Sequence, residues 1–146
     1  MTGQIHESAC SIHTDDTWQE IPFGTVSQRS VENNDSQTIK PLRVRLINCV
    51  LERKNGSFWN DVEVTFDGEK DSSTPTLFAV NGNAEGIGLR IYDYQGISVA
   101  PGEVLPSVEL KEGGNEINYN LGLITNGKLL KEGDWFSTIK FVVAYQ

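Results

Sequence analysis

The sequence contains few of the residues that carry catalysis or bind metals. Its 146 residues include two cysteines, two histidines and one methionine, and no GxSxG motif that would place a serine nucleophile on a strained turn. His6 and His13 could join Asp15 and Asp16 at a surface metal, but histidines at a strand edge are far more often solvated. We therefore expect no enzyme, no cofactor and no metal site.

The sequence also lacks a net positive charge and long hydrophobic runs. The formal net charge is −8, whereas a nucleic-acid-binding protein needs a basic face for the phosphates, so we expect no nucleic-acid partner. Apolar runs such as residues 141–145 fall far short of the roughly 20 residues that a transmembrane helix needs. The 38% of apolar residues suffices for a globular core. At this length we expect residues 1–146 to form one domain.

The two cysteines leave two interpretations open. Cys10 and Cys49 lie 39 positions apart with no CxxC motif, which argues against a zinc site. They are either free thiols in a reducing compartment or one disulfide in an oxidising one. We favour the disulfide, because the cysteines flank strand-like segments and a small all-β domain gains from a cross-link. The N-terminus shows no export signal, so we expect that any leader has been removed.

Alternation of apolar and polar residues dominates the sequence and predicts an all-β fold. Turn signals rich in Gly and Asn separate the alternating segments, and no 11-residue window has the apolar period of a helix. The polar stretch 28–39 predicts a loop. This pattern is typical of a β-sandwich or barrel. The predicted strands are residues 41–49, 61–68, 86–93 and 116–124, with strand pieces in 3–12 and 17–26.

The last alternating segment has no successor that could pair with it. Every second residue from Trp135 to Tyr145 is Trp, Ser, Ile, Phe, Val or Tyr. An immunoglobulin-type sandwich places one further strand after such a segment. Without it, a hydrophobic groove and unpaired strand edges would be exposed, unless another polypeptide donates a strand. The segment therefore predicts an open strand edge and an apolar groove that a strand from another polypeptide would complete.

One aromatic pair suggests a second class of function. Phe58 and Trp59 lie beside Asn60 and Asp61 and could form a platform for a sugar ring. Aromatic residues near strand starts usually pack, so we expect one of the two rings to close the end of the sandwich. A carbohydrate-binding, adhesin-type module remains an alternative.

Four segments follow one another in an order that points to a known family. Residues 3–12 (GQIHESACSI) contain a glycine, a short strand and the first cysteine, and residues 41–49 (PLRVRLINC) form a strand that ends at the second. Residues 86–96 (GIGLRIYDYQG) supply a central strand and turn. Residues 133–146 (GDWFSTIKFVVAYQ) begin at a glycine, alternate, and have a penultimate tyrosine. Together, this order and spacing resembles the subunits of chaperone–usher pili, or fimbriae.

The resemblance implies an incomplete immunoglobulin-like β-sandwich that lacks its final (G) strand. It also implies a Cys10–Cys49 disulfide and a groove between the first and last strands. In this family a periplasmic chaperone lends a strand to the groove and grips the final strand with its terminal carboxylate. In the fibre, the N-terminal extension of a neighbouring subunit replaces the chaperone. The strand would start at Gly133, and an outer-membrane usher is a further partner. The groove residues that the resemblance implies are Ile5, Trp135, Ile139, Phe141, Val143, Tyr145 and Gln146.

The chain departs from the family at its start. Family subunits carry a donor extension before the glycine that matches Gly3, but only Met1 and Thr2 precede it here. We expect that the donor extension has been removed, and that the shortened chain tends to associate with itself through its open groove.

Within the family, the interior segments are most similar to the minor subunit that ends the rod of P-type pili and anchors it at the outer membrane. An ordinary major or adaptor pilin is the alternative. Either role implies export, a periplasmic stage and a final place in the fimbrium at the cell surface. The segments that carry the similarity are residues 15–24, 62–91, 101–110 and 118–136.

Overall fold

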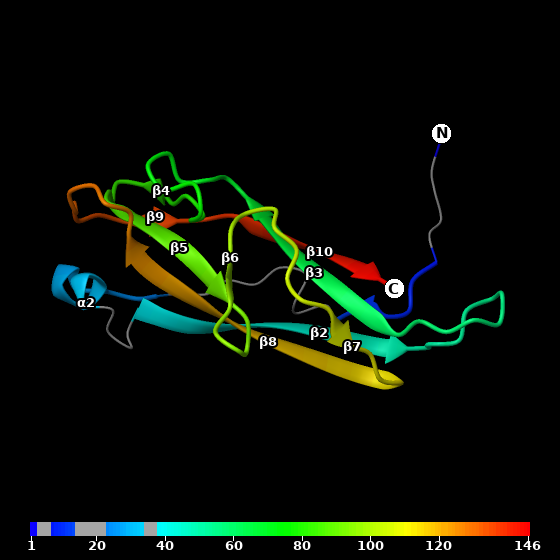
Figure 1. Ribbon diagram of the computed structural model, residues 1–146. Helices are drawn as coiled ribbons and strands as arrows, with labels where there is room; N and C mark the ends of the chain where they lie inside the picture. Colours follow the sequence, from blue (N-terminus) through cyan, green and yellow to red (C-terminus); the bar gives the residue numbers. More distant parts are fainter. Residues whose placement is uncertain (3–6, 14–22, 34–37) are drawn as a thin grey trace.

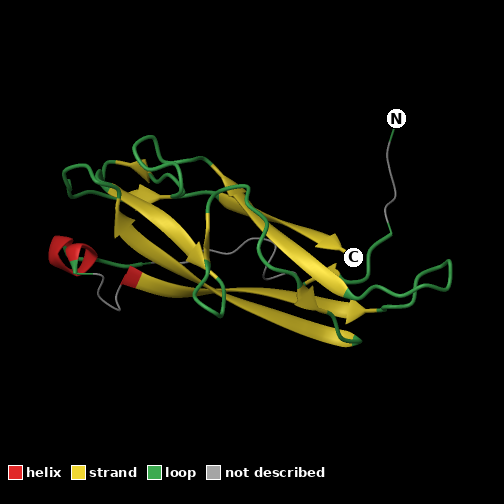
Figure 2. Cartoon of the chain, viewed as in Figure 1, coloured by secondary structure: helices red, strands yellow, loops and turns green. Residues whose placement is uncertain are grey.

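The computed structural model describes residues 1–2, 7–13, 23–33 and 38–146, and within them the fold is almost entirely β (Figure 1 and Figure 2). This confirms the predicted all-β class. The strands are β1 (Ser11–Ile12), β2 (Ile39–Cys49), β3 (Asp61–Gly68), β4 (Asn81–Gly82), β5 (Ile87–Tyr92), β6 (Ser98–Val99), β7 (Val108–Glu109), β8 (Gly113–Thr125), β9 (Trp135–Phe136) and β10 (Ile139–Tyr145).

The described strands form two main layers. A five-stranded sheet has the order β1-β2-β8-β5-β6, and a three-stranded sheet has the order β10-β3-β7. A two-stranded ribbon pairs β4 with β9. All of the recorded strand pairs are antiparallel, and Figure 1 shows β3 and β10 lying across β2 and β8.

Alternation along the long strands explains the core between the layers. In β2, Leu42, Val44 and Leu46 are buried while Arg43 and Arg45 face outward. A period of two places every second side chain on the same face of a sheet, so one face of each strand is apolar. The strands that supply the centre of the core, β2, β3, β5 and β8, agree with four of the predicted segments to within a few residues.

The final apolar segment is divided, contrary to the prediction of one continuous strand. β9 pairs with β4 through Trp135 and Gly82, whereas β10 begins at Ile139 and pairs with β3. Between them the Ser137 hydroxyl donates to the Ala79 carbonyl oxygen at 2.7 Å. The alternation continues through the break, which is why periodicity alone did not reveal it.

The predicted loop over residues 28–39 is also partly wrong, because the short helix α2 (Gln28–Glu32) lies in it. The Ser27 side chain caps this helix by accepting a hydrogen bond from the Ser30 backbone nitrogen at 3.1 Å. Val31 anchors it, since only 5% of its surface is exposed. Five residues are too few to show the apolar period of a helix.

The predicted strand pieces near the N-terminus are only partly described. β1 covers the end of the 3–12 segment, and residues 3–6 lie outside the described residues. Of the 17–26 segment only residues 23–26 are described, and these are not in a strand. Within the described parts of the chain, the helix present is neither long nor apolar enough to cross a membrane.

Candidate functional site

β10 lies at the edge of the three-stranded sheet. Its register pairs Phe141 with Phe66, Val143 with Val64 and Tyr145 with Val62. Among the described residues β3 is the only strand that pairs with β10, so the other edge of β10 has no strand beside it there. An edge strand presents a row of backbone N–H and C=O groups that can pair with another strand.

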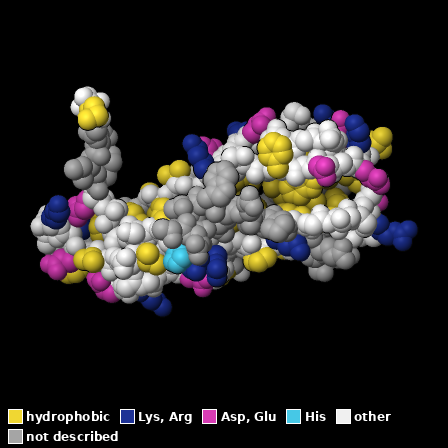
Figure 3. All heavy atoms as spheres, turned by 180° about the vertical axis from the view of Figure 1, so that it is seen from behind, with side chains coloured by type: hydrophobic (Ala, Val, Ile, Leu, Met, Phe, Trp, Pro, Cys, Tyr) yellow, Lys and Arg dark blue, Asp and Glu magenta, His cyan; other side chains and the backbone are white. Residues whose placement is uncertain are grey.

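A large apolar cleft opens beside this edge. Its volume is about 1310 Å³, and its walls come from both sheets, from α2 and from the segment between β8 and β10. In Figure 3 hydrophobic side chains gather in a hollow toward the end of the molecule that carries α2, with acidic side chains at its rim. The core residues that line it are Leu42, Phe66, Ile87, Leu89, Leu121 and Leu123.

Three of the predicted groove residues line this cleft. Trp135, Ile139 and Phe141 contribute to its walls, and all three are half-buried. The Trp135 ring lies 5.2 Å from that of Phe23, and the Phe141 ring lies 6.3 Å from that of Phe66.

The segment before β9 approaches another loop so closely that it requires a glycine. Gly133 has a φ of 156°, and a Cβ atom there would lie 2.8 Å from the Ala84 backbone nitrogen. The predicted strand-start glycine therefore marks a close backbone contact at the rim of the cleft rather than the start of β10.

The other predicted groove residues lie elsewhere. Val143 and Tyr145 are half-buried on the same face of β10 but do not line the cleft. Ile5 lies outside the described residues, as do Gly3 and three members of the considered metal cluster, His6, Asp15 and Asp16. The fourth, His13, is half-buried, and its backbone nitrogen donates to the Arg45 carbonyl oxygen at 2.9 Å. No group of three or more potential metal ligands occurs within the described part of the chain.

Tyr145 fastens the end of β10 to the opposite wall of the sandwich. Its hydroxyl donates to the Cys10 carbonyl oxygen at 3.3 Å, and its ring lies 5.9 Å from that of Trp59. Burial raises the pKa of the Tyr145 hydroxyl, because the phenolate would lose its hydration. This end of the strand is therefore engaged with the chain itself.

The backbone of Gln146 is also engaged. Its carbonyl oxygen accepts hydrogen bonds from the backbone nitrogens of Asn60 at 2.7 Å and Asp61 at 3.0 Å. Its own nitrogen donates to the Asp61 carbonyl oxygen at 2.8 Å. β10 is thus held at its Tyr145 end, while its Ile139 end borders the cleft.

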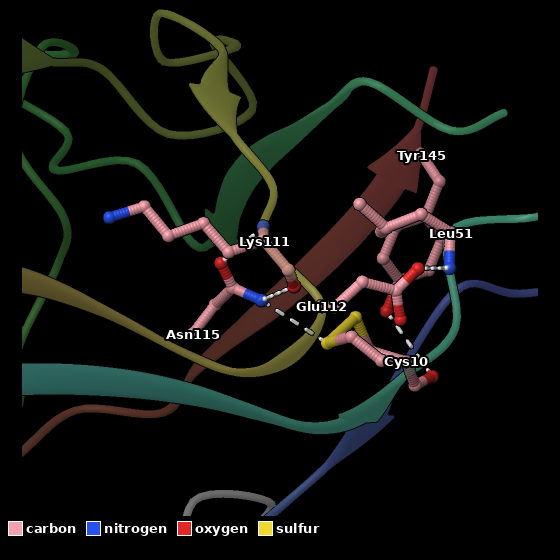
Figure 4. The surroundings of a disulfide bond; sticks show 7 residues. Cys10, Leu51, Lys111, Glu112, Asn115 and Tyr145 are labelled. Carbon is pink, nitrogen blue, oxygen red and sulfur yellow. Dashed lines mark hydrogen bonds between the residues drawn. A yellow bond between two sulfur atoms is a disulfide. The ribbon is translucent and has the colours of Figure 1, made fainter.

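The cysteines form the predicted disulfide. Cys10 and Cys49 are bonded, with their Cα atoms 4.1 Å apart, so the bond joins the segment before β1 to the end of β2. Figure 4 shows Asn115 beside it, donating from Nδ2 to the Cys49 sulfur at 3.3 Å, and Tyr145 reaching Cys10 from β10. The Glu112 carboxylate accepts from the Leu51 backbone nitrogen at 3.1 Å, which holds the chain that leaves β2.

The two aromatic residues that follow β2, Phe58 and Trp59, differ in their surroundings. Trp59 packs against the core. The Arg53 guanidinium stacks over its ring in a cation–π contact, with the central carbon 3.8 Å from the ring centroid. With Tyr145 also against it, Trp59 fits the predicted role of closing the end of the sandwich. Phe58 remains 60% exposed.

A buried polar cluster supports the wall of the cleft at the end of β8. The Asp71 carboxylate accepts from Asn126 Nδ2 at 3.0 Å, from the Thr74 backbone nitrogen at 2.9 Å, and from both the backbone nitrogen and the hydroxyl of Ser73. Burial alone would raise the pKa of Asp71, but these hydrogen bonds outweigh it and leave the pKa below its ordinary value. Asn126 in turn donates from its backbone to the Gly86 carbonyl oxygen at 3.1 Å, next to the cleft-lining residue Ile87.

Several lining residues were missed by the sequence analysis. Phe23, Val26 and Val31 reach the cleft from the chain around α2, and Leu130 reaches it from the turn after β8. Their apolar character was the only signal in the sequence, and it is too common a feature to assign a residue to a site.

Comparison with known proteins places this geometry in a family. The family model for fimbrial proteins matches residues 1–146. Two minor pilins of Escherichia coli, the PAP and the PRS fimbrial minor pilin proteins, are each 33% identical over 146 residues, covering 99% of this chain and 74% of theirs. The crystal structure of the P pilus rod subunit PapA superimposes with a TM-score of 0.82 at 23% identity, over 95% of this chain and all of the other.

The chain therefore belongs to the fimbrial protein family, as a pilin of the chaperone–usher type. Pilins are structural proteins rather than enzymes. Membership implies association with other pilin subunits in a pilus outside the cell.

Proposed function

We propose that this pilin works by donor-strand complementation, with the cleft beside β10 receiving a strand from another polypeptide. The observation that carries the proposal is the combination of two features in one place: an apolar cleft of about 1310 Å³ and an edge of β10 that lacks a neighbouring strand among the described residues. Either feature alone is common. Together they match what a donated strand needs, since its backbone pairs with the edge while alternate side chains fill the cleft.

The donated strand would take the place of the final (G) strand that the family resemblance predicts to be absent from the immunoglobulin-like sandwich. Its inward side chains would contact Ile139 and Phe141 on β10 and the core below them. Each aliphatic or aromatic side chain buried in this way contributes about 1.5–3 kcal/mol. Val143 and Tyr145 do not line the cleft itself, but they would shape the far end of the strand site.

The sequence of partners follows from the family resemblance. A periplasmic chaperone occupies the cleft first, an outer-membrane usher receives the complex, and the chain is then built into the fimbrium at the cell surface. Residues 1–146 act as a single pilin domain in this sequence of events.

We further propose that the chain terminates and anchors the rod. The two E. coli relatives that are 33% identical are minor pilins, which supports a role at a special position rather than along the rod. In addition, Val31 of α2 and the residues Leu130–Asp134 contribute to the cleft walls. Walls of this kind would shorten the cleft, so that an incoming donor strand from another subunit could not begin to displace the chaperone.

Displacement of bound chaperone tests both parts of the proposal. The chain should copurify with a periplasmic chaperone of a P-type pilus system, and a donor-strand peptide from a rod pilin should displace that chaperone slowly or not at all. Rapid displacement would leave an ordinary major or adaptor subunit, whereas failure to bind any pilus chaperone would remove strand complementation altogether.

A matched pair of variants on α2 sharpens the test. Val31→Ala trims a side chain that lines the cleft and should speed displacement, while Arg29→Ala on the exposed side of the same helix should not. If both variants behave like the unchanged chain, α2 does not close the cleft.

A further inference from the structure

Asparagine is followed by glycine at three places in the chain: Asn55–Gly56, Asn81–Gly82 and Asn126–Gly127. In such a pair the backbone nitrogen of the glycine can attack the side-chain carbonyl carbon of the asparagine, because glycine has no Cβ to hinder a close approach. The attack requires the asparagine side chain and the glycine backbone to turn toward each other. The structure leaves the three pairs with very different freedom to do so.

Asn55 lies in the loop that joins β2 to β3, which projects from the end of the sandwich (Figure 1). Residues 54–57 are all exposed. A Cβ atom on Gly56 would meet no atom within 4 Å, so no other part of the described chain packs against this glycine. The backbone at this pair therefore has room to change its conformation.

Two hydrogen bonds polarise the side chain of Asn55. The Ser57 hydroxyl donates to Asn55 Oδ1 at 2.6 Å, and the Ser57 backbone nitrogen donates to the same oxygen at 3.0 Å. When a nitrogen attacks the side-chain carbonyl carbon, negative charge develops on this oxygen. Donors that are aimed at an oxygen where charge develops act as an oxyanion hole. The loop therefore activates the Asn55 amide as well as exposing it.

One hydrogen bond must open before the reaction. The Gly56 backbone nitrogen donates to the Arg53 carbonyl oxygen at 2.9 Å across the turn. The turn has to open before this nitrogen can reach the Asn55 side chain. Exposed loops open locally at a small cost in free energy, so the hydrogen bond limits the rate of the attack rather than preventing it.

The pair at Asn126 is held by the buried polar cluster. Asn126 is only 9% exposed, its Nδ2 donates to the Asp71 carboxylate at 3.0 Å, and its Oδ1 accepts from the Lys128 backbone nitrogen at 3.0 Å. Loss of Nδ2 would leave the buried carboxylate without one of its donors. Both the movement and the product are therefore unfavourable at this site.

The pair at Asn81 is held by its backbone. Asn81 pairs with Phe136 in the ribbon of β4 and β9. A Cβ atom on Gly82 would collide with the Asp134 carbonyl oxygen, so the two chain segments are in close contact there. Rotation of this backbone toward the Asn81 side chain would break the pairing.

We propose that Asn55 is a site of spontaneous modification, at which its neutral amide is converted into a carboxylate without an enzyme. The Gly56 nitrogen bonds to Asn55 Cγ, the bond from Cγ to Nδ2 breaks, and ammonia leaves with the proton that the Gly56 nitrogen gives up. Water then adds to one of the two carbonyl carbons of the succinimide ring and opens it. The product is aspartate or isoaspartate, and neither step oxidises or reduces the chain. The two Ser57 donors stabilise the charge on Oδ1 during the attack.

The modification changes the loop that flanks the end of β10. Arg53 in this loop stacks over Trp59, which contacts Tyr145. Aspartate adds a negative charge to the loop. Isoaspartate also adds one carbon to the backbone of the turn, which the hydrogen bond from the Arg53 nitrogen to the Ser57 carbonyl oxygen closes at 2.7 Å. Because Asn55 does not line the cleft, its modification is independent of strand donation.

Peptide mapping of the full chain by mass spectrometry tests the proposal. After incubation of the folded chain in mildly alkaline buffer, the peptide that contains Asn55 should gain the mass difference between O and NH. Conversion at Asn81 and Asn126 should be at least about tenfold slower, because paired and buried segments open less often. In urea all three should convert at similar rates. An unmodified Asn55 in the folded chain, or equal rates at Asn55 and Asn126, overturns the proposal.

A serine variant tests the oxyanion hole. Ser57→Ala removes one of the two donors to Asn55 Oδ1 and keeps the other. It should slow conversion in the folded chain about threefold to tenfold, less than the loss of a donor in a closed active site, and leave the rate in urea unchanged. Ser98→Ala, at an exposed position on β6, is the matched control and should have no effect. Equal rates in the two folded variants contradict the role of Ser57.

The identity of the product tests the attacking group. Opening of a succinimide ring yields both aspartate and isoaspartate, whereas direct hydrolysis of the amide by water yields aspartate alone. A protease that cleaves before aspartate and not before isoaspartate separates the two products. Isoaspartate at position 55 supports attack by the Gly56 nitrogen, and aspartate alone overturns it.

Discussion

β3 and β10 are antiparallel partners with the same alternation of side chains, yet their inward residues are buried to different extents. On β3, Val62, Val64 and Phe66 are 0–1% exposed. Their partners on β10, Tyr145, Val143 and Phe141, are only half-buried. β3 has strands on both sides, whereas β10 has one neighbour among the described residues and borders the cleft. Alternation therefore tells which side chains face inward, and the neighbours of a strand decide how much of each is covered.

The difference suggests a division of labour between the two strands. The side chains of β3 are buried by the chain's own core, so they stabilise the isolated subunit. The inward side chains of β10 leave part of their apolar surface exposed, and a donated strand would cover this surface. The following predictions test this comparison, starting with the largest expected effect.

Truncation of the paired phenylalanines should separate the two strands most clearly. Phe66→Ala should lower the free energy of unfolding by about 3–5 kcal/mol, because the ring is buried and packs edge-on against Tyr119 at 4.9 Å. Phe141→Ala should cost the isolated chain about 1–2 kcal/mol, since its ring is already partly in solvent. Urea unfolding of both variants measures the difference. Equal losses of unfolding free energy would contradict the claim that β3 stabilises the isolated chain more than β10 does.

Removal of the disulfide should affect β10 more than β3. Replacing Cys10 and Cys49 together by serine should cost about 2–4 kcal/mol. It should also make the Cys10 segment more mobile and so weaken the hydrogen bond that the Cys10 carbonyl oxygen accepts from the Tyr145 hydroxyl. Hydrogen exchange on the variant should therefore accelerate first near Tyr145, and a uniform acceleration along both strands would contradict this link.

Acid should weaken the polar cluster that follows β3. The pKa of Asp71 is lower in the folded chain than its ordinary value of 3.8, so its stabilising contribution is present above pH 3.8 and is lost as pH falls through the folded-state pKa. Asp71→Asn should cost about 1–3 kcal/mol at pH 7 and flatten the pH dependence below pH 4. Thermal melts at pH 7 and pH 3 test this, with Asp61→Asn as a half-buried control; the same acid response in Asp71→Asn as in the unchanged chain would refute the assignment.

The smallest expected effect is that of Tyr145→Phe. It removes the hydrogen bond to Cys10 but keeps the ring against Trp59, so it should cost about 0.5–1.5 kcal/mol. A matched Tyr119→Phe variant tests a tyrosine of the fully covered region. Chemical denaturation measures the free energy of unfolding of both variants. A loss above about 3 kcal/mol for Tyr145→Phe would mean that the end of β10 is packed as tightly as the core.

The sequence allowed the all-β class, the central strands and the disulfide to be predicted, because period-two alternation and the order of family segments are local signals. The break between Phe136 and Ile139 was not predictable, since the alternation runs through it. α2 was missed because a helix of five residues is too short to show an apolar period, and its only stabilising features are the Ser27 cap and the buried Val31.

The candidate site was predicted only in part, for a similar reason. Phe141 and Ile139 were predicted because they match the alternating final strand of the family that the sequence resembles, and both line the cleft. Phe23 and Leu130 were not, because their place in the cleft depends on how distant loops fold back over the sheets. Contacts of that kind leave no periodic trace in the sequence.

The most direct test of the account is residue-resolved amide hydrogen exchange along β10, with β3 as the internal reference, in the chain alone and bound to a pilus chaperone. In the free chain every second amide of β10 should exchange rapidly, because it faces the open edge, while β3 stays protected on both sides. Chaperone binding should protect the rapid set. Slow exchange at all β10 amides in the free chain, or an unchanged rapid set in the complex, would contradict the claim that β10 is completed by a strand from another polypeptide.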